Sequence, residues 1–349
     1  MVDMNAIQRV LIVKVSAMGD IIHALPVCAA LKDAYPHLEI SWAVEEAFVP
    51  LLEGNPCLTS LVVLPKIRGR DLRRLAFYKA YFDKIRCACG KGIDLSLDLQ
   101  GLTKSAVIAF KSGAKIRLGY HWLREGAKLL EKPVPRRPQS VHIVDQYLDV
   151  AYALGASTKH VRFPFYIPEA DDTAIDDLLI RSGVDPGAPY VCVNPASARA
   201  MKQWSAERFG SLMDRMYGAT GRPCVLVTAD VGVAAEAASH AKRPVANLAG
   251  KTTLKQLAAV LRRGTVHVCG DTGSGHLAAA LGRPVVSLIG PTDPDRACPY
   301  GQRENAITQR EVCGVQCDGR KCQFDRPRCM DAIQVDDVAN KALSLMCQT

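Results

Sequence analysis

Two short segments of the chain each combine a carboxylate with glycine at the start of a helical pattern. The first is Met18-Gly19-Asp20, which follows an apolar run at residues 10–15. The second is Asp-Thr-Gly-Ser-Gly-His at residues 271–276, which follows an apolar run at 266–269. Because ligands of open α/β sheets bind outside the carboxyl ends of the strands, each segment is a candidate half of a ligand site.

The position of Asp20 suits a general base. The positive end of a helix stabilises a nearby anion, and an ionised carboxylate can accept the proton of an attacking hydroxyl. That hydroxyl becomes more acidic as its bond to carbon forms, so a weak base is sufficient. The alternative is that Asp20 only caps the helix.

The segment at 271–276 suits phosphate binding. Amide N–H groups are unpaired at the start of a helix, and glycine lets the backbone approach an anion closely. Asp271 would repel a diphosphate that it faced, so we expect it to orient backbone or sugar hydroxyls. A single Gly-x-Gly is not the dinucleotide fingerprint, which disfavours a nicotinamide-dependent oxidoreductase.

Two further charged side chains are candidates for the same site. Lys202, two residues before Trp204, could neutralise the charge of a departing diphosphate, or it could be a solvated surface lysine. Glu236 follows the apolar run at 224–228 at the interval where α/β nucleotide sites place a ribose-binding carboxylate. An exposed helical glutamate is the alternative for Glu236.

The order of apolar runs predicts two α/β domains in the 349 residues. The expected strands of the first half lie at 10–15, 40–44, 61–64, 95–99 and 116–118. Those of the second half lie at 190–193, 224–228, 266–269 and 285–289. We expect domains at 1–168 and 190–334, a proline-containing linker at 169–189 and a final helix at 335–349.

The composition narrows the classes of partner. The net charge of +9 favours a polyanionic partner, but few aromatic residues lie among the basic clusters, which disfavours nucleic acid. Neither a secretory signal nor an apolar run long enough to span a membrane is visible, so we expect a cytoplasmic protein.

In a reducing compartment the 13 cysteines indicate thiols or metal ligands before disulfides. Four of them form a cysteine-rich segment at 313–329. For this segment a structural metal, a disulfide and free thiols all remain open, because the spacing lacks a Cys-x2-Cys knuckle. Its members are Cys313, Cys317, Cys322 and Cys329.

Read together, the segments at 9–26 and 269–276 resemble the heptosyltransferases of glycosyltransferase family nine. The resemblance includes Gly-Pro-Thr-Asp-Pro at 290–294. Three other segments look most like heptosyltransferase I: Ala-Val-Glu-Glu-Ala-Phe at 43–48, Asp-Leu-Gln-Gly-Leu-Thr-Lys-Ser at 98–105 and Lys-Gln-Trp at 202–204. The family pattern has a further residue between Gly273 and a serine, whereas Ser274-Gly275 stands here.

The resemblance implies a GT-B-like fold, two Rossmann-like α/β domains facing across a cleft, and an inverting transfer of heptose from ADP-heptose to 3-deoxy-manno-octulosonic acid (Kdo) of the lipopolysaccharide inner core. It implies no required cofactor and a peripheral location at the cytoplasmic face of the inner membrane. It assigns catalysis to Asp20 and Lys202. It assigns donor binding to Gly19, Ser197, Lys202, Glu236, Asp271, Thr272, Gly273 and His276. It assigns the anionic Kdo-lipid A acceptor to Arg68, Arg70, Arg73, Arg74, Lys104 and Arg124.

Two other functions remain open at this point. One is a transferase of the same family with a heptose acceptor, such as heptosyltransferase II or III. The other belongs to a different class, a nucleotide- or nucleic-acid-binding protein organised by a zinc-bound cysteine module.

Overall fold

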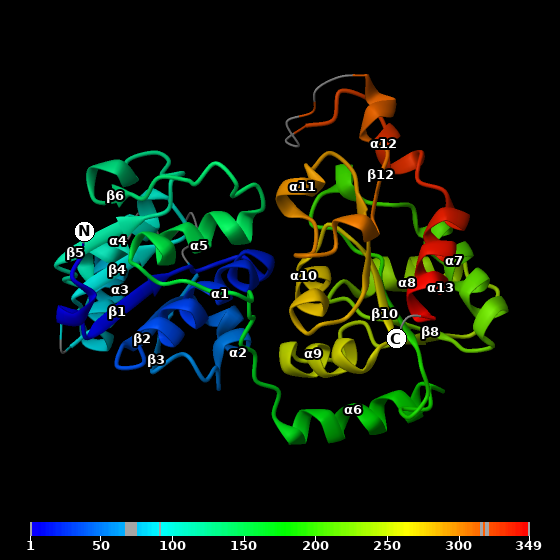
Figure 1. Cartoon of the computed structure of the whole chain (residues 1–349). Coiled ribbons are helices and arrows are strands. Elements are labelled where there is room, and N and C mark those ends of the chain that lie inside the picture. The colour runs from blue at the N-terminus through cyan, green and yellow to red at the C-terminus, as the bar shows by residue number, and fades with distance from the viewer. Residues whose placement is uncertain (1, 67–74, 91, 315–316, 318–320, 348–349) are drawn as a thin grey trace. The chain divides into compact units, whose positions relative to one another are not determined.

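In the computed structural model the chain forms two compact units, Met1–Tyr166 and Ile167–Thr349. The structure describes residues 2–66, 75–90, 92–314, 317 and 321–347 (Figure 1). Each unit consists of one sheet of parallel strands with covering helices, which confirms the predicted α/β class.

The first unit has a six-stranded sheet in the order β3-β2-β1-β4-β5-β6. Its strands are β1 (Arg9–Val13), β2 (Glu39–Glu45), β3 (Ser60–Leu64), β4 (Leu95–Asp98), β5 (Ile116–Gly119) and β6 (Lys132–Pro133). Its helices are α1 (Met18–Ala34), α2 (Val49–Leu52), α3 (Leu75–Ala88), α4 (Thr103–Lys111) and α5 (Ile143–Ala153). Helix α1 packs against α5 and is buried over most of its length.

The second unit repeats this strand order as β12-β11-β10-β7-β8-β9. Its strands are β7 (Val191–Asn194), β8 (Cys224–Leu226), β9 (Val245–Asn247), β10 (Val266–Gly270), β11 (Val285–Ile289) and β12 (Ala306–Thr308). Its helices are α6 (Glu169–Arg181), α7 (Ala206–Thr220), α8 (Val231–Ser239), α9 (Leu254–Arg263), α10 (Gly273–Ala280), α11 (Pro294–Ala297), α12 (Arg328–Asp331) and α13 (Val335–Met346).

In both sheets the strand order reverses at the centre, between β1 and β4 and between β7 and β10. Val13 pairs with Asp98 across the first reversal, and Cys269 pairs with Asn194 across the second. Ligands of doubly wound sheets bind where the order reverses, because the flanking helices leave on opposite faces there. Both polar segments that the sequence singles out follow one of these central strands.

The central strands form where the sequence has uninterrupted apolar runs. Strands β10 and β11 are buried at every residue, as expected for parallel strands covered on both faces. The edge strands β6, β9 and β12 were not predicted, since each has only two or three residues. Such short runs carry no periodicity to recognise.

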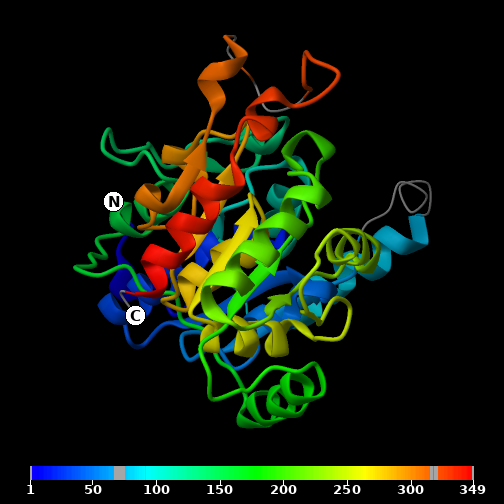
Figure 2. The same ribbon diagram turned by 90° about the vertical axis from the view of Figure 1, so that its right-hand side faces the viewer.

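The segment 169–189, which we expect to be a linker, contains the helix α6. Acidic residues fill its first turn, which suits the positive end of a helix. Asp172 and Asp176 form ion pairs with Arg262 and Arg263 of α9, so α6 belongs to the second unit. The final helix α13 packs on α7 and on strands of the same unit (Figure 2).

A buried pair of carboxyl groups holds the loop that follows β4. Asp98 accepts hydrogen bonds from the amides of Gln100 and Gly101, at 2.7 and 3.0 Å, and from the Ser105 hydroxyl at 2.6 Å. Glu131 lies against Asp98, and no residue that the structure describes donates to either Glu131 oxygen. A proton between the two carboxyls satisfies both groups, and burial together with the Asp98 charge raises the pKa of Glu131 to about 10.

This pair predicts a pH dependence of stability. Between pH 4.5 and about 10 the folded protein keeps a proton on Glu131 that the unfolded chain releases, so stability falls as the pH rises through this window. In Glu131→Gln an amide N–H donates to Asp98 at every pH, so this pH dependence disappears. The slopes of the free energy of unfolding against pH should therefore differ between the two proteins by up to about 1.4 kcal/mol per pH unit.

Urea unfolding of both proteins at pH 6 and pH 9 measures this slope. Glu46→Gln, at an exposed position of the same unit, is the matched control and should follow the wild type. Parallel curves for Glu131→Gln and the wild type would contradict the shared proton.

Candidate active site

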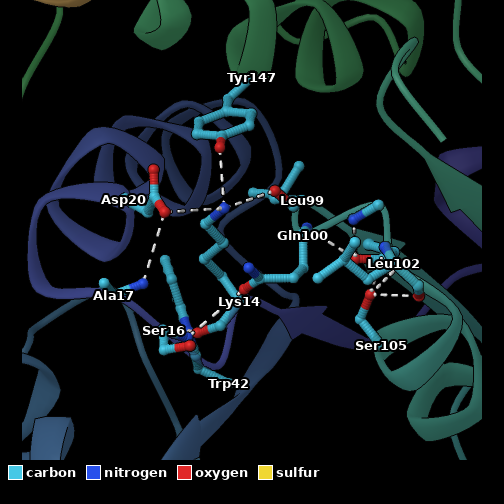
Figure 3. A network of polar contacts seen from close by, with 12 residues as sticks. Lys14, Ser16, Ala17, Asp20, Trp42, Leu99, Gln100, Leu102, Ser105 and Tyr147 are labelled. Atoms are coloured by element: carbon cyan, nitrogen blue, oxygen red, sulfur yellow. Dashed lines mark hydrogen bonds and ion pairs between the residues drawn. The ribbon is translucent and has the colours of Figure 1, made fainter. Parts of the chain in front are cut away.

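Asp20 lies in the first turn of α1, directly beyond the carboxyl end of β1. Its side chain is 47% exposed, and its carboxylate accepts a hydrogen bond of 3.5 Å from the amide of Ala17 (Figure 3). Ala17 is the N-cap of the helix, and Asp20 at position N3 accepts its amide as in a capping box, so Asp20 supports the helix start without being the N-cap. The exposed carboxylate at the edge of the sheet is accessible to a substrate.

A buried lysine lies behind Asp20. The Lys14 ammonium donates to the Leu99 carbonyl at 3.0 Å and to the Tyr147 hydroxyl at 2.8 Å, and it lies 4.0 Å from the Asp20 carboxylate (Figure 3). Lys14 is only 2% exposed. Burial lowers the pKa of Lys14, and the Asp20 carboxylate acts in the opposite direction. The Asp20 carboxylate therefore favours the charged form of the buried lysine.

The loop after β4 completes this half-site. Leu99 supplies the carbonyl that holds Lys14, and the Gln100 side chain accepts the Ser16 amide at 3.4 Å (Figure 3). The indole of the fully buried Trp42 donates to the Lys14 carbonyl at 3.0 Å. Lys14 is thus fixed through both its backbone and its side chain.

Two of the expected acceptor-binding residues lie beside this loop. Lys104, in the first turn of α4, forms an ion pair of 3.5 Å with Glu45 and is 40% exposed. Arg124 stacks on the ring of Trp122 at 5.2 Å, and its amide donates to the Gly101 carbonyl at 2.8 Å. The other four, Arg68, Arg70, Arg73 and Arg74, lie outside the described residues.

The second half-site contains an ion pair between two residues that the sequence singles out. The Lys202 ammonium lies 2.6 Å from the Asp271 carboxylate, which also accepts the Thr292 hydroxyl at 2.7 Å. His276 lies 3.9 Å from the other carboxylate oxygen. Burial alone would raise the pKa of Asp271, but Lys202, His276 and Thr292 outweigh it and lower that pKa.

The Asp271 carboxylate holds the Lys202 ammonium and the Thr292 hydroxyl. That Asp271 orients backbone or sugar hydroxyls stays a prediction. Lys202 is 18% exposed at its side chain, so it is not a solvated surface lysine.

A buried tryptophan fixes the backbone near Lys202. Trp204 packs edge-on against Phe209 at 4.9 Å, and its indole donates to the Ile333 carbonyl at 3.3 Å. The short helical turn Ala200–Lys202 is therefore anchored two residues beyond Lys202.

The remaining expected donor residues differ in their surroundings. Thr272 is the N-cap of α10 and Gly273 its first residue, and His276 is buried in the same helix. The Ser197 hydroxyl oxygen is buried, with no hydrogen-bond partner among the residues the structure describes. Gly19 lies beside Asp20 in α1, and Glu236 is exposed on α8, as in the alternative stated for it.

The four cysteines of the cysteine-rich segment 313–329 all line one cavity of about 360 Å³, together with residues of the 290–295 loop. Cys313 and Cys322 lie near Cys329, and burial is the main cause that raises the pKa of Cys329 to about 11. Over the described part of the chain, no three cysteine, histidine or acidic side chains are grouped so that they could hold a metal ion.

Sequence reasoning missed several polar residues of these half-sites. They are Tyr147, Gln100, Asn194 and His267, together with the structural importance of Lys14. A lysine inside an apolar strand was a visible signal, because a charged residue is rarely buried without partners.

Among the described helices, none has the length and apolar character needed to cross a bilayer.

Comparison with known proteins identifies the family to which the chain is similar. The model of glycosyltransferase family 9 (heptosyltransferase) matches residues 85–326. Lipopolysaccharide heptosyltransferase 1 of Salmonella typhimurium is 29% identical over 310 residues, 87% of this chain and 95% of that protein. Lipopolysaccharide core heptosyltransferase OpsX of Haemophilus influenzae is 24% identical over 305 residues, 86% of this chain and 84% of that protein.

Solved structures show the same fold. A glycosyl transferase family 9 structure from Veillonella parvula has a TM-score of 0.82 at 22% identity and covers 98% of both chains. E. coli heptosyltransferase WaaC with ADP-2-deoxy-2-fluoro heptose has a TM-score of 0.72 at 24% identity, covering 97% of this chain and 99% of that one.

The chain therefore belongs to glycosyltransferase family 9, the heptosyltransferase family. It is a glycosyltransferase, and the predicted GT-B-like fold is confirmed. The family resemblance found in the sequence is confirmed as well, and the alternatives from other classes are thereby disfavoured.

The Lys14 contacts predict a defect in turnover. Lys14→Met should lower kcat about 10- to 100-fold with little change in the KM of the donor, because a cation 4.0 Å from Asp20 is lost. Tyr147→Phe keeps the lysine and removes one of its acceptors, so its loss should be smaller. Steady-state kinetics on variants with wild-type circular dichroism test this; equal kcat in Lys14→Met and the wild type would refute it.

The Lys202–Asp271 pair predicts a different pattern. Lys202→Met should lower kcat about 100- to 1,000-fold, because a preorganised cation at developing charge contributes a few kcal/mol to catalysis. Asp271→Asn keeps the cation and loses its orientation, so it should be affected less. Lys242→Met removes an exposed lysine of the same unit and is the matched control. A rate in Lys202→Met equal to the control would contradict a role at the leaving group.

Proposed function

We propose that this protein is an inverting glycosyltransferase that moves heptose from ADP-L-glycero-β-D-manno-heptose to Kdo of the lipopolysaccharide inner core. The proposal is carried by two observations in a chain of glycosyltransferase family 9: the first unit has an exposed carboxylate, Asp20, and the second unit has a cationic half-site at Lys202. Two of the relatives named above are lipopolysaccharide heptosyltransferases.

Asp20 acts as the general base. It removes the proton of the acceptor hydroxyl as that oxygen attacks the anomeric carbon, and ADP leaves from the opposite face in a single displacement. Lys14 holds the carboxylate in position and stabilises its charge until the proton is transferred. Inversion at the anomeric carbon follows from this single displacement.

The second half-site stabilises the leaving ADP. Lys202 supplies a cation, and the first-turn amides of α10 supply N–H groups at the positive end of a helix. This combination neutralises the diphosphate as its charge increases, so the proposed reaction requires no cofactor. The Ser197 hydroxyl, which has no hydrogen-bond partner among the described residues, is a further candidate for a donor contact. So is the His276 ring.

The acceptor is bound by basic residues of the first unit. Guanidinium groups pair bidentately with carboxylates and phosphates, which are the anionic groups of Kdo and lipid A. Lys104 and Arg124 lie beside the loop that holds Lys14, and the arginines at 68–74 complete the proposed set. A lipid-anchored acceptor would bring the protein to the cytoplasmic face of the inner membrane.

A heptose acceptor is the second candidate function. Lipopolysaccharide heptosyltransferase 3 of E. coli is 26% identical over 253 residues, so the similar proteins include a heptosyltransferase 3 as well as a heptosyltransferase 1. The two acceptors differ in charge, since Kdo carries a carboxylate. Substitution of the acceptor arginines should therefore impair transfer to Kdo more than transfer to a heptose.

Incubation of the wild type and Asp20→Asn with ADP-heptose and Kdo-terminated lipid A tests the proposal. The wild type should release ADP and add one heptose to the product mass. Asp20→Asn should lose about 100- to 10,000-fold in rate, the usual contribution of a general base. Transfer only to a heptose-terminated acceptor would support the second candidate function. An unchanged rate in Asp20→Asn would exclude Asp20 as the general base.

A further inference from the structure

A buried chain of hydrogen bonds lies behind the donor half-site, and Ser274 is its centre. The Ser274 hydroxyl oxygen lies 2.8 Å from the Asn194 amide nitrogen Nδ2, 3.0 Å from the His267 ring nitrogen Nε2 and 3.0 Å from the Thr272 hydroxyl oxygen. Ser274 is 4% exposed and His267 is 1% exposed. A hydroxyl has one hydrogen and two lone pairs, so each of the three contacts has a fixed direction.

The first direction is set by Asn194. Its amide oxygen Oδ1 accepts the backbone N–H of Ala196 at 3.0 Å, which fixes the orientation of the amide. The nitrogen Nδ2 therefore faces Ser274 and donates to it. One lone pair of Ser274 is occupied.

The second direction is set by His267. Its ring nitrogen Nδ1 lies 3.3 Å from the Cys192 carbonyl oxygen, which can only accept, so Nδ1 carries a hydrogen. Burial lowers the pKa of His267 to about 4, so the ring is neutral and Nε2 carries no hydrogen. Nε2 is therefore an acceptor, and it takes the single hydrogen of Ser274.

The third direction follows for Thr272. Ser274 has only a lone pair left, so the Thr272 hydroxyl must donate to it; otherwise two lone pairs would face each other at 3.0 Å. The buried Cys269 thiol also interacts with both hydroxyls. A Thr272 hydrogen shared between the Ser274 oxygen and that sulfur points into the protein in the same way. The hydroxyl oxygen of the half-buried Thr272 therefore offers only lone pairs to a ligand.

We propose that Thr272 recognises a sugar hydroxyl of the nucleotide sugar, as a hydrogen-bond acceptor, and does not donate to the diphosphate. This inference rests on the proposed function, in which this half-site holds the donor. Ionised phosphate oxygens only accept, so they need the Lys202 ammonium and the backbone amides. The Thr272 side chain accepts no hydrogen bond from the first-turn amides of α10, so it does not compete with a phosphate for those N–H groups.

The departure from the family pattern at this segment fits the proposal. A Cβ atom at Gly275 would lie 2.7 Å from the Cys269 sulfur, so a serine at that position would require a shift of the sulfur or the helix. In this chain the serine stands one position before Gly275, at Ser274, and its hydroxyl contacts His267 and Asn194. The chain of directed hydrogen bonds thus has at its centre Ser274, a residue at which this sequence departs from the family pattern.

The tautomer of His267 tests the chain directly. Nitrogen-15 NMR of the imidazole rings at pH 7, with the signal assigned by its loss in His267→Asn, should show hydrogen on Nδ1 and none on Nε2. The state should be the same with and without ADP. Hydrogen on Nε2, or a charged ring, would overturn the assigned directions. This readout does not depend on catalysis, so it is separate from the proposed function.

Ligand binding tests the recognition itself. Thr272→Val should weaken ADP-heptose about 5- to 10-fold, the loss expected for one hydrogen bond, while inhibition by pyrophosphate stays within about 2-fold of the wild type. Thr272→Ser keeps the oxygen and should restore ADP-heptose binding. The affinity for ADP shows which sugar carries the recognised hydroxyl. If the hydroxyl is on ribose, Thr272→Val binds both ADP and ADP-heptose more weakly. If it is on heptose, the affinity for ADP stays unchanged.

Two results would overturn the proposal. Pyrophosphate inhibition that weakens in Thr272→Val as much as ADP-heptose binding would mean that Thr272 donates to phosphate. Unchanged binding of all three ligands would mean that Thr272 contacts none of them. A wild type that binds neither ADP nor ADP-heptose would instead refute the proposed function, with the His267 tautomer unaffected.

Discussion

The reversal of strand order at the centre of each sheet is the constraint on which both half-sites depend. Strands are added outward in both directions from β1 and β4, and again from β7 and β10. Parallel pairing brings Val13 level with Asp98 and Cys269 level with Asn194, so the loops that follow these residues leave the same edge side by side. Residues far apart in sequence, such as Lys14 and Leu99, meet for this reason.

Buried polar groups then fix the side chains at those edges. A charge removed from water is costly unless partners surround it, and each buried charge here has several. Lys14 has a carbonyl, a phenol and a carboxylate, while Asp98 has three donors and the Glu131 carboxyl. Replacement of such groups by apolar residues often leaves stability unchanged, so their value here lies in position and charge.

The sequence was informative where a pattern extends over several residues. Apolar runs predicted the central strands, and the glycine-containing turns after β1 and β10 identified Asp20 and Asp271. It was uninformative where a contact depends on distant segments: Tyr147 lies 133 positions from Lys14, and no local spacing connects them. The helix α6 was missed because prolines at both ends of the segment resembled a linker, although its ion pairs to α9 stabilise it.

Under the proposed function, the Lys202–Asp271 pair raises the question of why a site for a diphosphate contains a carboxylate. Asp271 weakens the attraction for a diphosphate in the ground state, but it holds the ammonium in one place. In the proposed reaction, departure of the sugar adds charge to the diphosphate, so its pairing with Lys202 strengthens as the transition state is approached. Interactions that strengthen in this way lower the barrier, whereas uniform attraction would only tighten binding. A cation oriented beforehand also requires no reorganisation at that moment, so a carboxylate beside it favours turnover over affinity.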